Sequence, residues 1–228
     1  MRKIALLLPT ILITLATTSC SNDAKTDLIS ENIKGNVKSI EQTTYKAVYI
    51  DSVATKTDTV LLMSIADFDT DGFKSSFCEF EGPNKTKTTY QFKYNDNGQR
   101  TESLSFNEAG TLIEKQVHSY DGIDNTQTDN FNANGDFMFR YTYPKDIEEG
   151  TLQTIIEDNK GNMSYKYVFT LDEKGNYVTM IVYHKNGDVY SNSVCEYQFD
   201  KNNNWIKMTE IMDNKPRSIT ERKIIYYN

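Results

Sequence analysis

The chain has 228 residues, with 25 Lys and Arg against 32 Asp and Glu and a formal net charge of −7. This acidic balance, without any basic run, argues against a nucleic-acid partner, because a phosphate-backbone binder needs a basic patch. The only histidines, His118 and His184, lie far apart in the sequence and form no zinc-type cluster with the three cysteines. We therefore expect no cofactor.

The first 19 residues are predicted to be a signal peptide. Arg2 and Lys3 form a basic start, and residues 4–16 are an apolar run. A membrane-spanning helix needs roughly 20 apolar residues, so this run is too short to be a permanent anchor. A basic start, a short apolar run and small residues before a cleavage point are the three parts of a secretory signal.

Residues 15–20, Leu-Ala-Thr-Thr-Ser-Cys, resemble the bacterial lipobox, although Thr17 departs from the usual Leu. The resemblance implies that Cys20 carries the lipid and becomes the first residue of the mature protein, so that a membrane is the partner. Acyl chains bind membranes through about 0.8 kcal/mol per buried methylene. Ser21 is compatible with sorting to the outer membrane. The alternative is a secreted protein with an incidental cysteine.

Residues 20–35 are expected to form a lipidated N-terminus and polar tether, with one or two helical turns between Asp27 and Ile33. From residue 36 to residue 228, glycines punctuate the chain regularly. Those from Gly98 to Gly187 are 11 to 15 residues apart, which is typical of short strands joined by turns. Asn-Gly pairs such as Asn97-Gly98 indicate type I′ hairpin turns.

Between the turns, apolar and polar residues alternate with a period of two. Residues 163–171 and 90–94 place aromatic and aliphatic side chains on one face and mostly polar ones on the other. This alternation is typical of an antiparallel sheet with one wet side. The sequence therefore predicts an all-β fold, an antiparallel meander of repeated β-hairpins that forms a curved or rolled sheet.

The hairpins repeat in detail. Residues 197–205 echo residues 169–177, residues 92–99 form a third copy, and residues 132–136 are a fainter fourth. Such short repeats cannot bury their own faces and must stack or roll together. The pattern aromatic-x-aromatic-Asp/Asn-x-x-Gly-Asn resembles the YD repeat of Rhs-type bacterial proteins, and more closely the small bacterial lipoproteins built from degenerate YD-like hairpins. This resemblance implies a turn signature and no catalytic residue.

Asp67, Asp69 and Asp71, followed by Gly72, match the first half of an EF-hand calcium loop. The twelfth position is Cys78 instead of Glu, and the flanks are predicted strands. An acidic hairpin turn is therefore the favoured interpretation, and a calcium-stabilised structural module stays as an alternative.

Other chemistry has little support in the sequence. No Gly-x-Ser-x-Gly elbow is present, so we expect no enzyme, with a hydrolase of unrecognised type as a further alternative. Trp205 and the tyrosine ladders are candidate surfaces for a glycan or protein ligand, although strand aromatics usually pack across strands.

Cys78 and Cys195 could form a disulfide in an oxidising compartment or remain two buried thiols. The resulting prediction is an outer-membrane lipoprotein with a non-enzymatic binding or scaffolding role.

Overall fold

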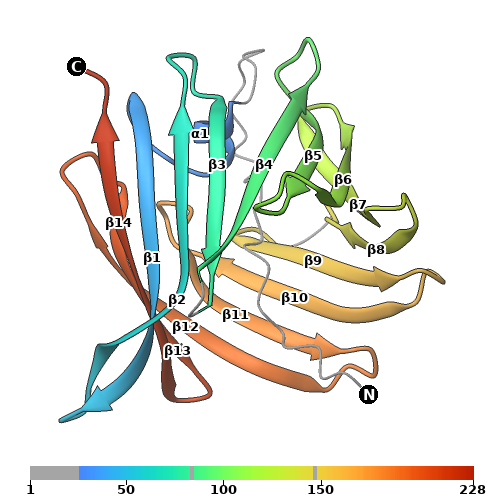
Figure 1. Cartoon of the computed structure of the whole chain (residues 1–228). Coiled ribbons are helices and arrows are strands. Elements are labelled where there is room, and N and C mark those ends of the chain that lie inside the picture. Colours follow the sequence, from blue (N-terminus) through green and yellow to red (C-terminus); the bar gives the residue numbers. More distant parts are fainter. Residues whose placement is uncertain (1–25, 83–84, 146–147) are drawn as a thin grey trace.

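The computed structural model describes residues 26–82, 85–145 and 148–228. Within them, antiparallel strands follow one another as a meander, and the last strand pairs with the first to close a barrel (Figure 1). The expected all-β meander is confirmed, and the rolled sheet is a closed barrel. The strands are β1 (Val37–Ile50), β2 (Val53–Phe68), β3 (Lys74–Glu81), β4 (Thr86–Tyr94), β5 (Arg100–Phe106), β6 (Leu112–Asp121), β7 (Asp124–Asn132), β8 (Phe137–Thr142), β9 (Thr151–Asp158), β10 (Met163–Leu171), β11 (Tyr177–His184), β12 (Val189–Phe199), β13 (Trp205–Met212) and β14 (Lys215–Tyr226).

Eight five-residue turns of the described chain share one hydrogen-bond pattern. The N–H of the first residue donates to the carbonyl of the fifth, and the N–H of the fourth donates to the carbonyl of the first. The fourth residue is glycine in seven of these turns and Asn203 in the eighth, always with positive φ. In seven turns the first residue is Asp or Asn, whose side chain accepts a bond from the fifth N–H. The sequence repeat therefore encodes turns.

The prediction of type I′ turns at the Asn-Gly pairs is wrong. Of the pair Asn97-Gly98, only the glycine has positive φ, and the hydrogen bonds are those of a three-residue hairpin loop with a left-handed bulge. Two-residue turns with positive φ at both centres occur instead at Asp51-Ser52 and Asp213-Asn214. Asp and Asn tolerate the left-handed region better than most residues, so these tight turns form without glycine.

The short helix α1 (Asp27–Ser30) lies inside one end of the barrel, behind β2 and β3 in Figure 1. Thr26 caps the helix, and Leu28 and Ile33 pack with Val37, Ile40, Ala66 and Phe68 in a buried apolar cluster. The helical turn predicted in the tether is confirmed, but it belongs to the packed interior. We call this closed end the floor of the barrel and the opposite end the mouth.

The floor cluster identifies which face of the wall points inward. Ile40 and Ala66 pair across β1 and β2 and both contact α1, so alternate residues of every strand, followed through the pairing register, share this inner face. Inner-facing side chains from floor to mid-barrel include Gln42, Thr44, Glu79, Tyr90, Phe92, Ser103, Gln116, His118, Thr128, Asn130, Tyr141, Thr154, Tyr167, Val182, Ser193, Tyr197, Glu210, Thr220 and Arg222.

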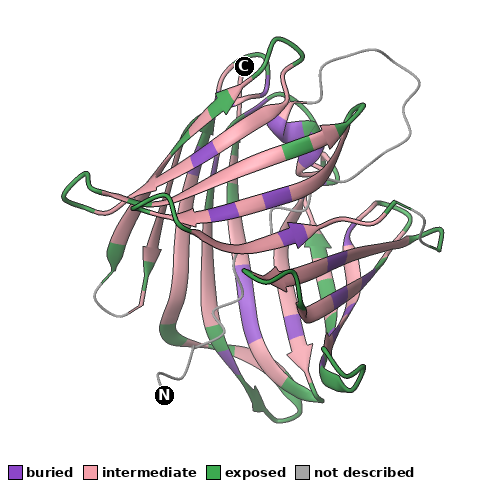
Figure 2. Cartoon of the chain, turned by 90° about the vertical axis from the view of Figure 1, so that its right-hand side faces the viewer, coloured by how far each residue is buried: buried purple, intermediate pink, exposed green. Residues whose placement is uncertain are grey.

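The inner face is unevenly buried (Figure 2). On β10 and β11, Tyr167, Phe169, Met180 and Val182 form a second buried cluster. On β1, β4 and β14, by contrast, Gln42, Tyr90 and Arg222 are only half-buried. Because these side chains point inward, water reaches them from inside the barrel. The interior is therefore tightly packed around β10 and β11 and more accessible at Gln42, Tyr90 and Arg222.

Candidate ligand-binding lumen

Trp205, the only tryptophan of the chain, lies near the floor on the inner side. The guanidinium of Arg222 stacks on its ring, 3.4 Å from the ring centroid, and the ring of Tyr197 lies 5.9 Å away. Arg222 also donates from Nε to Oε1 of Gln42 at 2.9 Å. Burial lowers the pKa of Arg222 to about 10, which still leaves the side chain protonated at neutral pH. Trp205 is thus part of a polar and aromatic group at the floor.

A series of hydrogen-bonded hydroxyl and imidazole groups runs along the inner wall over the neighbouring strands β5, β6 and β7. His118 contacts Ser103 Oγ through Nε2 and Thr128 Oγ1 through Nδ1, each at 3.0 Å, and Tyr143 donates to Thr128. Burial, with a smaller effect from Arg100, lowers the pKa of His118 to about 4. An imidazole with so low a pKa is a poor base at neutral pH, and a threonine stands where a catalytic triad has a carboxylate. These hydrogen bonds therefore connect neighbouring strands of the wall and do not activate Ser103 as a nucleophile.

Acidic groups also face the lumen. The carboxylate of Glu210 accepts bonds from Ser193 and Ser218 and pairs with Arg217 at 3.2 Å. Burial raises the pKa of Glu114, which contacts Gln116. These oxygens and amides give the lumen many hydrogen-bonding positions between its aromatic rings.

At the mouth, three rings meet beside an open hollow of 640 Å³. The ring of His184 lies 5.6 Å from that of Tyr165 and 4.8 Å from that of Tyr190. A register shift between β11 and β12 leaves Tyr190 outside the ladder, and such bulges turn a side chain to the other face. The hollow is also lined by Asp158, Asn162, Met163, Ser164 and Lys185.

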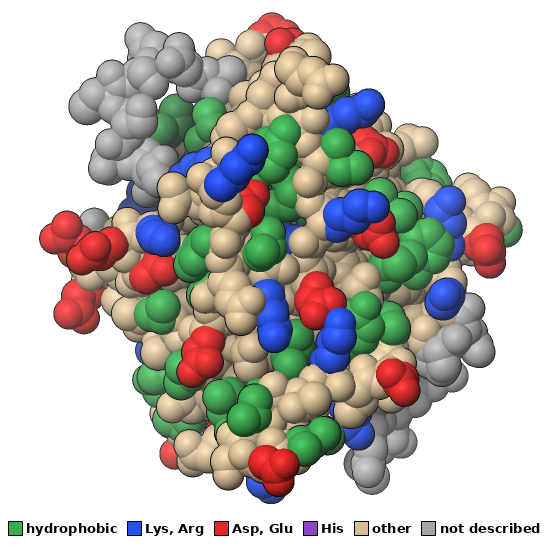
Figure 3. Space-filling view, turned by 90° about the vertical axis from the view of Figure 1, so that its left-hand side faces the viewer, with side chains coloured by type: hydrophobic (Ala, Val, Ile, Leu, Met, Phe, Trp, Pro, Cys, Tyr) green, Lys and Arg blue, Asp and Glu red, His purple; other side chains and the backbone are tan. Residues whose placement is uncertain are grey.

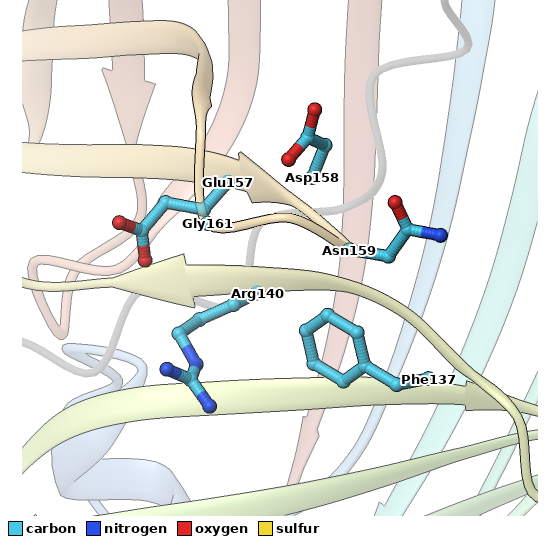
Figure 4. A pocket seen from close by; sticks show the side chains of 6 residues that line it. All are labelled: Phe137, Arg140, Glu157, Asp158, Asn159 and Gly161. Atoms are coloured by element: carbon cyan, nitrogen blue, oxygen red, sulfur yellow. The ribbon is translucent and has the colours of Figure 1, made fainter.

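A smaller hollow of 240 Å³ lies where β8 and β9 separate near the mouth. Figure 4 shows the residues that line it, among them Phe137 and Arg140 on β8 and Glu157 and Asn159 on the neighbouring strand and turn. The guanidinium of Arg140 is already paired with Asp129 at 2.6 Å. This hollow belongs to the outer face of the wall, so it is separate from the lumen.

The outer face carries ion pairs between neighbouring strands. Glu102 pairs with both Lys93 and Lys115 at 2.5 Å, and Lys56 pairs with Glu221 at 2.6 Å. Figure 3 shows acidic and basic side chains interspersed with apolar ones over one side of the molecule. Such a surface is typical of a wall in contact with water.

The structure does not bring the predicted calcium ligands together. Asp67 accepts a bond from Ser76 on the neighbouring strand, whereas Asp69 accepts from the backbone of its own turn. Over residues 26–82, 85–145 and 148–228, no group of three His, Cys, Asp or Glu side chains could hold a metal ion. Asp69 is the first residue of a five-residue turn, the role that the favoured interpretation gave to this segment.

Cys78 and Cys195 are free thiols on β3 and β12. Cys78 pairs with the outward-facing Ile65, whereas Cys195 pairs with the inward-facing Glu210. The two side chains therefore lie on opposite faces of the wall and on strands that are not neighbours, so the possible disulfide is not formed. Cys20, the predicted lipidation site, lies outside the described residues.

The sequence did not identify Arg222, His118 or Tyr190 as members of a site. A single arginine in an alternating strand carries no signal, and the inner position of Tyr190 depends on a bulge. Trp205 was a candidate from the sequence because tryptophan is rare and amphipathic, and its role in binding stays a prediction.

Comparisons with known protein families and with curated protein sequences find no match. Among solved structures, a porin-like protein from Bacteroides uniformis has a TM-score of 0.54 at 10% identity, covering 84% of this chain and 98% of that one. A porin-like protein from Bacteroides vulgatus has a TM-score of 0.42 at 12% identity, with the same coverages. A putative outer membrane lipoprotein-sorting protein domain from Vibrio parahaemolyticus has a TM-score of 0.38 at 10% identity, covering 84% and 86%. The first of these shows a shared fold.

The resemblance to YD-repeat, Rhs-type proteins is wrong. The solved structure that shares this fold is a porin-like protein, and the barrel closes through β1 and β14. The shared pattern arises because Asp or Asn at the first position and Gly at the fourth satisfy the same turn in any hairpin. In the described part of the chain, no helix is long and apolar enough to cross a membrane.

Proposed function

We propose that this chain is a non-enzymatic, envelope-anchored protein that holds a glycan inside its barrel. The observation that carries the proposal is the half-buried inner wall, where Trp205, Tyr90 and Tyr197 lie among hydroxyl, amide and carboxylate groups. Ligand sites combine apolar and aromatic surface with a few polar groups that fix orientation. A sugar ring presents an apolar face and a hydroxylated edge, so it matches this lining better than a lipid does.

The closed floor supports entry of the ligand from the mouth. Helix α1 and its apolar cluster fill the floor, whereas the mouth has exposed turns and the hollow beside Tyr165, His184 and Tyr190. Aromatic rings at both levels give a saccharide successive stacking positions. A glycan rather than a folded protein is favoured, because only an extended chain reaches from the rim to the floor.

The anchor proposed at Cys20 would orient the barrel. Thr26, at the floor, is six positions after Cys20, and a fully extended chain spans at most about 3.6 Å per residue. The floor would then lie within roughly 20 Å of the membrane surface, with the mouth directed away from it. The ion pairs on the outer face are consistent with a wall surrounded by water. We propose the outer membrane as the location because Ser21 follows the cysteine.

The anchor is tested by intact mass. Protein purified from its native membrane should begin at residue 20 and carry a lipid-sized extra mass, and Cys20→Ala should abolish both features. An unlipidated chain with the wild-type Cys20 would contradict the anchor and leave a secreted binding protein.

Binding is tested with the mature chain and cello-, malto- and galacturonate oligosaccharides. Because Trp205 is the only tryptophan, a ligand near the floor should change its fluorescence and raise the melting temperature through linkage. Arg140→Gln, on the outer face, is the matched control and should bind as the wild type does. If no oligosaccharide changes either signal at millimolar concentration, the lumen does not bind glycans.

A further inference from the structure

Arg222 differs from the other arginines of the described chain. Arg100 pairs with Asp27, Arg140 pairs with Asp129, and Arg217 pairs with Glu210. Arg222 has no carboxylate partner among the described residues; its contacts are the amide of Gln42 and the ring of Trp205. Its guanidinium faces inward, is half-buried and forms no ion pair, so it is able to pair with an anion that enters from solution.

Two other cations near the floor are paired with carboxylates. Lys74 pairs with Glu31 at 2.5 Å, and Arg100 pairs with Asp27. Both carboxylates come from the segment around α1, and each is matched by one cation of the wall. Arg222 forms no such ion pair, although the negative charge of Glu31 acts on it through space and acidic turn residues such as Asp200 lie at the same end.

The contacts of Arg222 also fix the direction of its free donors. Gln42 accepts from Nε, and the Trp205 ring covers one face of the guanidinium plane. The terminal nitrogens are not among the buried atoms without a partner, and the side chain is only half-buried. These N–H groups thus remain open to water in the lumen. Two parallel donors in a rigid fork match the oxygens of a carboxylate or a sulfate.

We infer that the glycan held in the lumen is acidic and that Arg222 binds its anionic group at the floor. The inference rests on the proposed function and names the class of saccharide: one bearing a carboxylate, as in a uronic acid, or a sulfate. Gln42 and Trp205 act as positioning residues, because they hold the guanidinium in place.

The test uses the mature chain and three probes: D-glucuronate, D-glucose and inorganic sulfate. Glucuronate and glucose share a ring and differ at one carboxylate. Glucuronate should change Trp205 fluorescence at concentrations at least 10-fold lower than glucose, with weaker binding as salt is raised. Arg222→Gln should weaken glucuronate binding about 10- to 100-fold, the range of a charge-assisted hydrogen bond, and weaken glucose binding much less. Arg222→Lys keeps the charge without the fork and should lose part of the affinity.

The controls separate this inference from the proposed function. Arg140→Gln removes a paired arginine on the outer face and should bind glucuronate normally. Urea unfolding should show that Arg222→Gln is folded and at least as stable as the wild type, because no ion pair is lost. Equal binding of glucuronate and glucose, or full binding by Arg222→Gln, overturns the acidic-glycan inference and leaves glycan binding intact. If sulfate binds as tightly as glucuronate, the site at the floor binds free anions, and the inference of an acidic saccharide is wrong. Failure of every saccharide overturns both proposals.

Discussion

The two ends of the barrel have the same kind of turn, but the floor is closed and the mouth is open. Residues 158–162 at the mouth and 172–176 at the floor are both Asp-x-Lys-Gly-Asn turns with the same hydrogen bonds. At the mouth the glycine has open space beside it, whereas at the floor Gly175 lies against Asn32, which follows α1. The turns therefore shape the wall, and the helical segment alone decides which end is closed. Substitutions that remove contacts of this segment should therefore show the largest difference in stability between the floor and the mouth.

The largest effect is expected for Asp27→Ala. The Asp27 carboxylate accepts bonds from the backbone N–H of Lys74, from Tyr94 and from Arg100, and is 5% exposed. Its loss leaves Arg100 buried without a counter-charge, which costs about 3–5 kcal/mol. Urea unfolding should show this decrease in the free energy of unfolding.

Asp71→Ala is the matched control for this prediction. Asp71 is an exposed residue of the turn at the same end, so its removal should change stability by less than about 0.5 kcal/mol. Equal effects of the two substitutions would mean that α1 does not hold the floor closed.

The second effect is a pH dependence located in the middle of the lumen. The pKa of His118 is lowered from 6.5 to about 4 in the folded chain. Between these pH values His118 is therefore protonated in the unfolded chain and neutral in the folded chain. Stability is then complete above pH 6.5 and falls by up to ~3 kcal/mol as the pH drops to about 4. His118→Gln should remove this component, measured as the difference in unfolding free energy from the wild type between pH 4 and pH 7.

His184→Gln provides the comparison at the mouth. It removes the other histidine of the chain, which has no part in the hydrogen bonds of His118, so the two variants compare the two positions. If His118→Gln unfolds with the same pH dependence as the wild type, His118 is not buried as a neutral group.

The third comparison uses the two matched turns. Gly161→Ala forces alanine to a φ of +77° with no atom within 4 Å and should cost about 1–2 kcal/mol. Gly175→Ala adds a contact at 3.2 Å with Nδ2 of Asn32, which donates to the carbonyl of Lys174. It should cost about 1 kcal/mol more, because it also breaks this bond. Thermal unfolding of both variants measures the difference, and equal costs would show that Asn32 moves freely.

The smallest effect on stability is expected at the mouth. Tyr190 is 47% exposed and lies outside the strand ladder, so Tyr190→Ala should change the free energy of unfolding by about 0.5 kcal/mol or less. Under the proposed function it should still weaken oligosaccharide binding several-fold, while glucuronate binding at the floor stays unchanged. Loss of monosaccharide binding as well would place the principal site at the mouth.

The wall of the barrel was largely predictable from the sequence. Alternation in residues 163–171 placed Tyr167 and Phe169 on one face, and that face is buried. The Asp/Asn and Gly positions located the turns, because backbone geometry at positive φ depends on the local residue. The sequence was misleading where one local pattern serves several structures: Asp67, Asp69 and Asp71 match a calcium loop and belong to a hairpin, and the repeat resembles a family that the chain's fold does not share.

By itself the sequence determined an acidic, all-β chain of hairpins, because charge, alternation and turn chemistry are local properties. Only the tertiary structure decided that the meander closes, that α1 fills one end, and that Cys78 and Cys195 face opposite sides of the wall. The same holds for the site. Gln42, Trp205 and Arg222 come from β1, β13 and β14, and the pairing of the first strand with the last brings them together. Such closure depends on contacts between residues far apart in the chain, which no local pattern specifies.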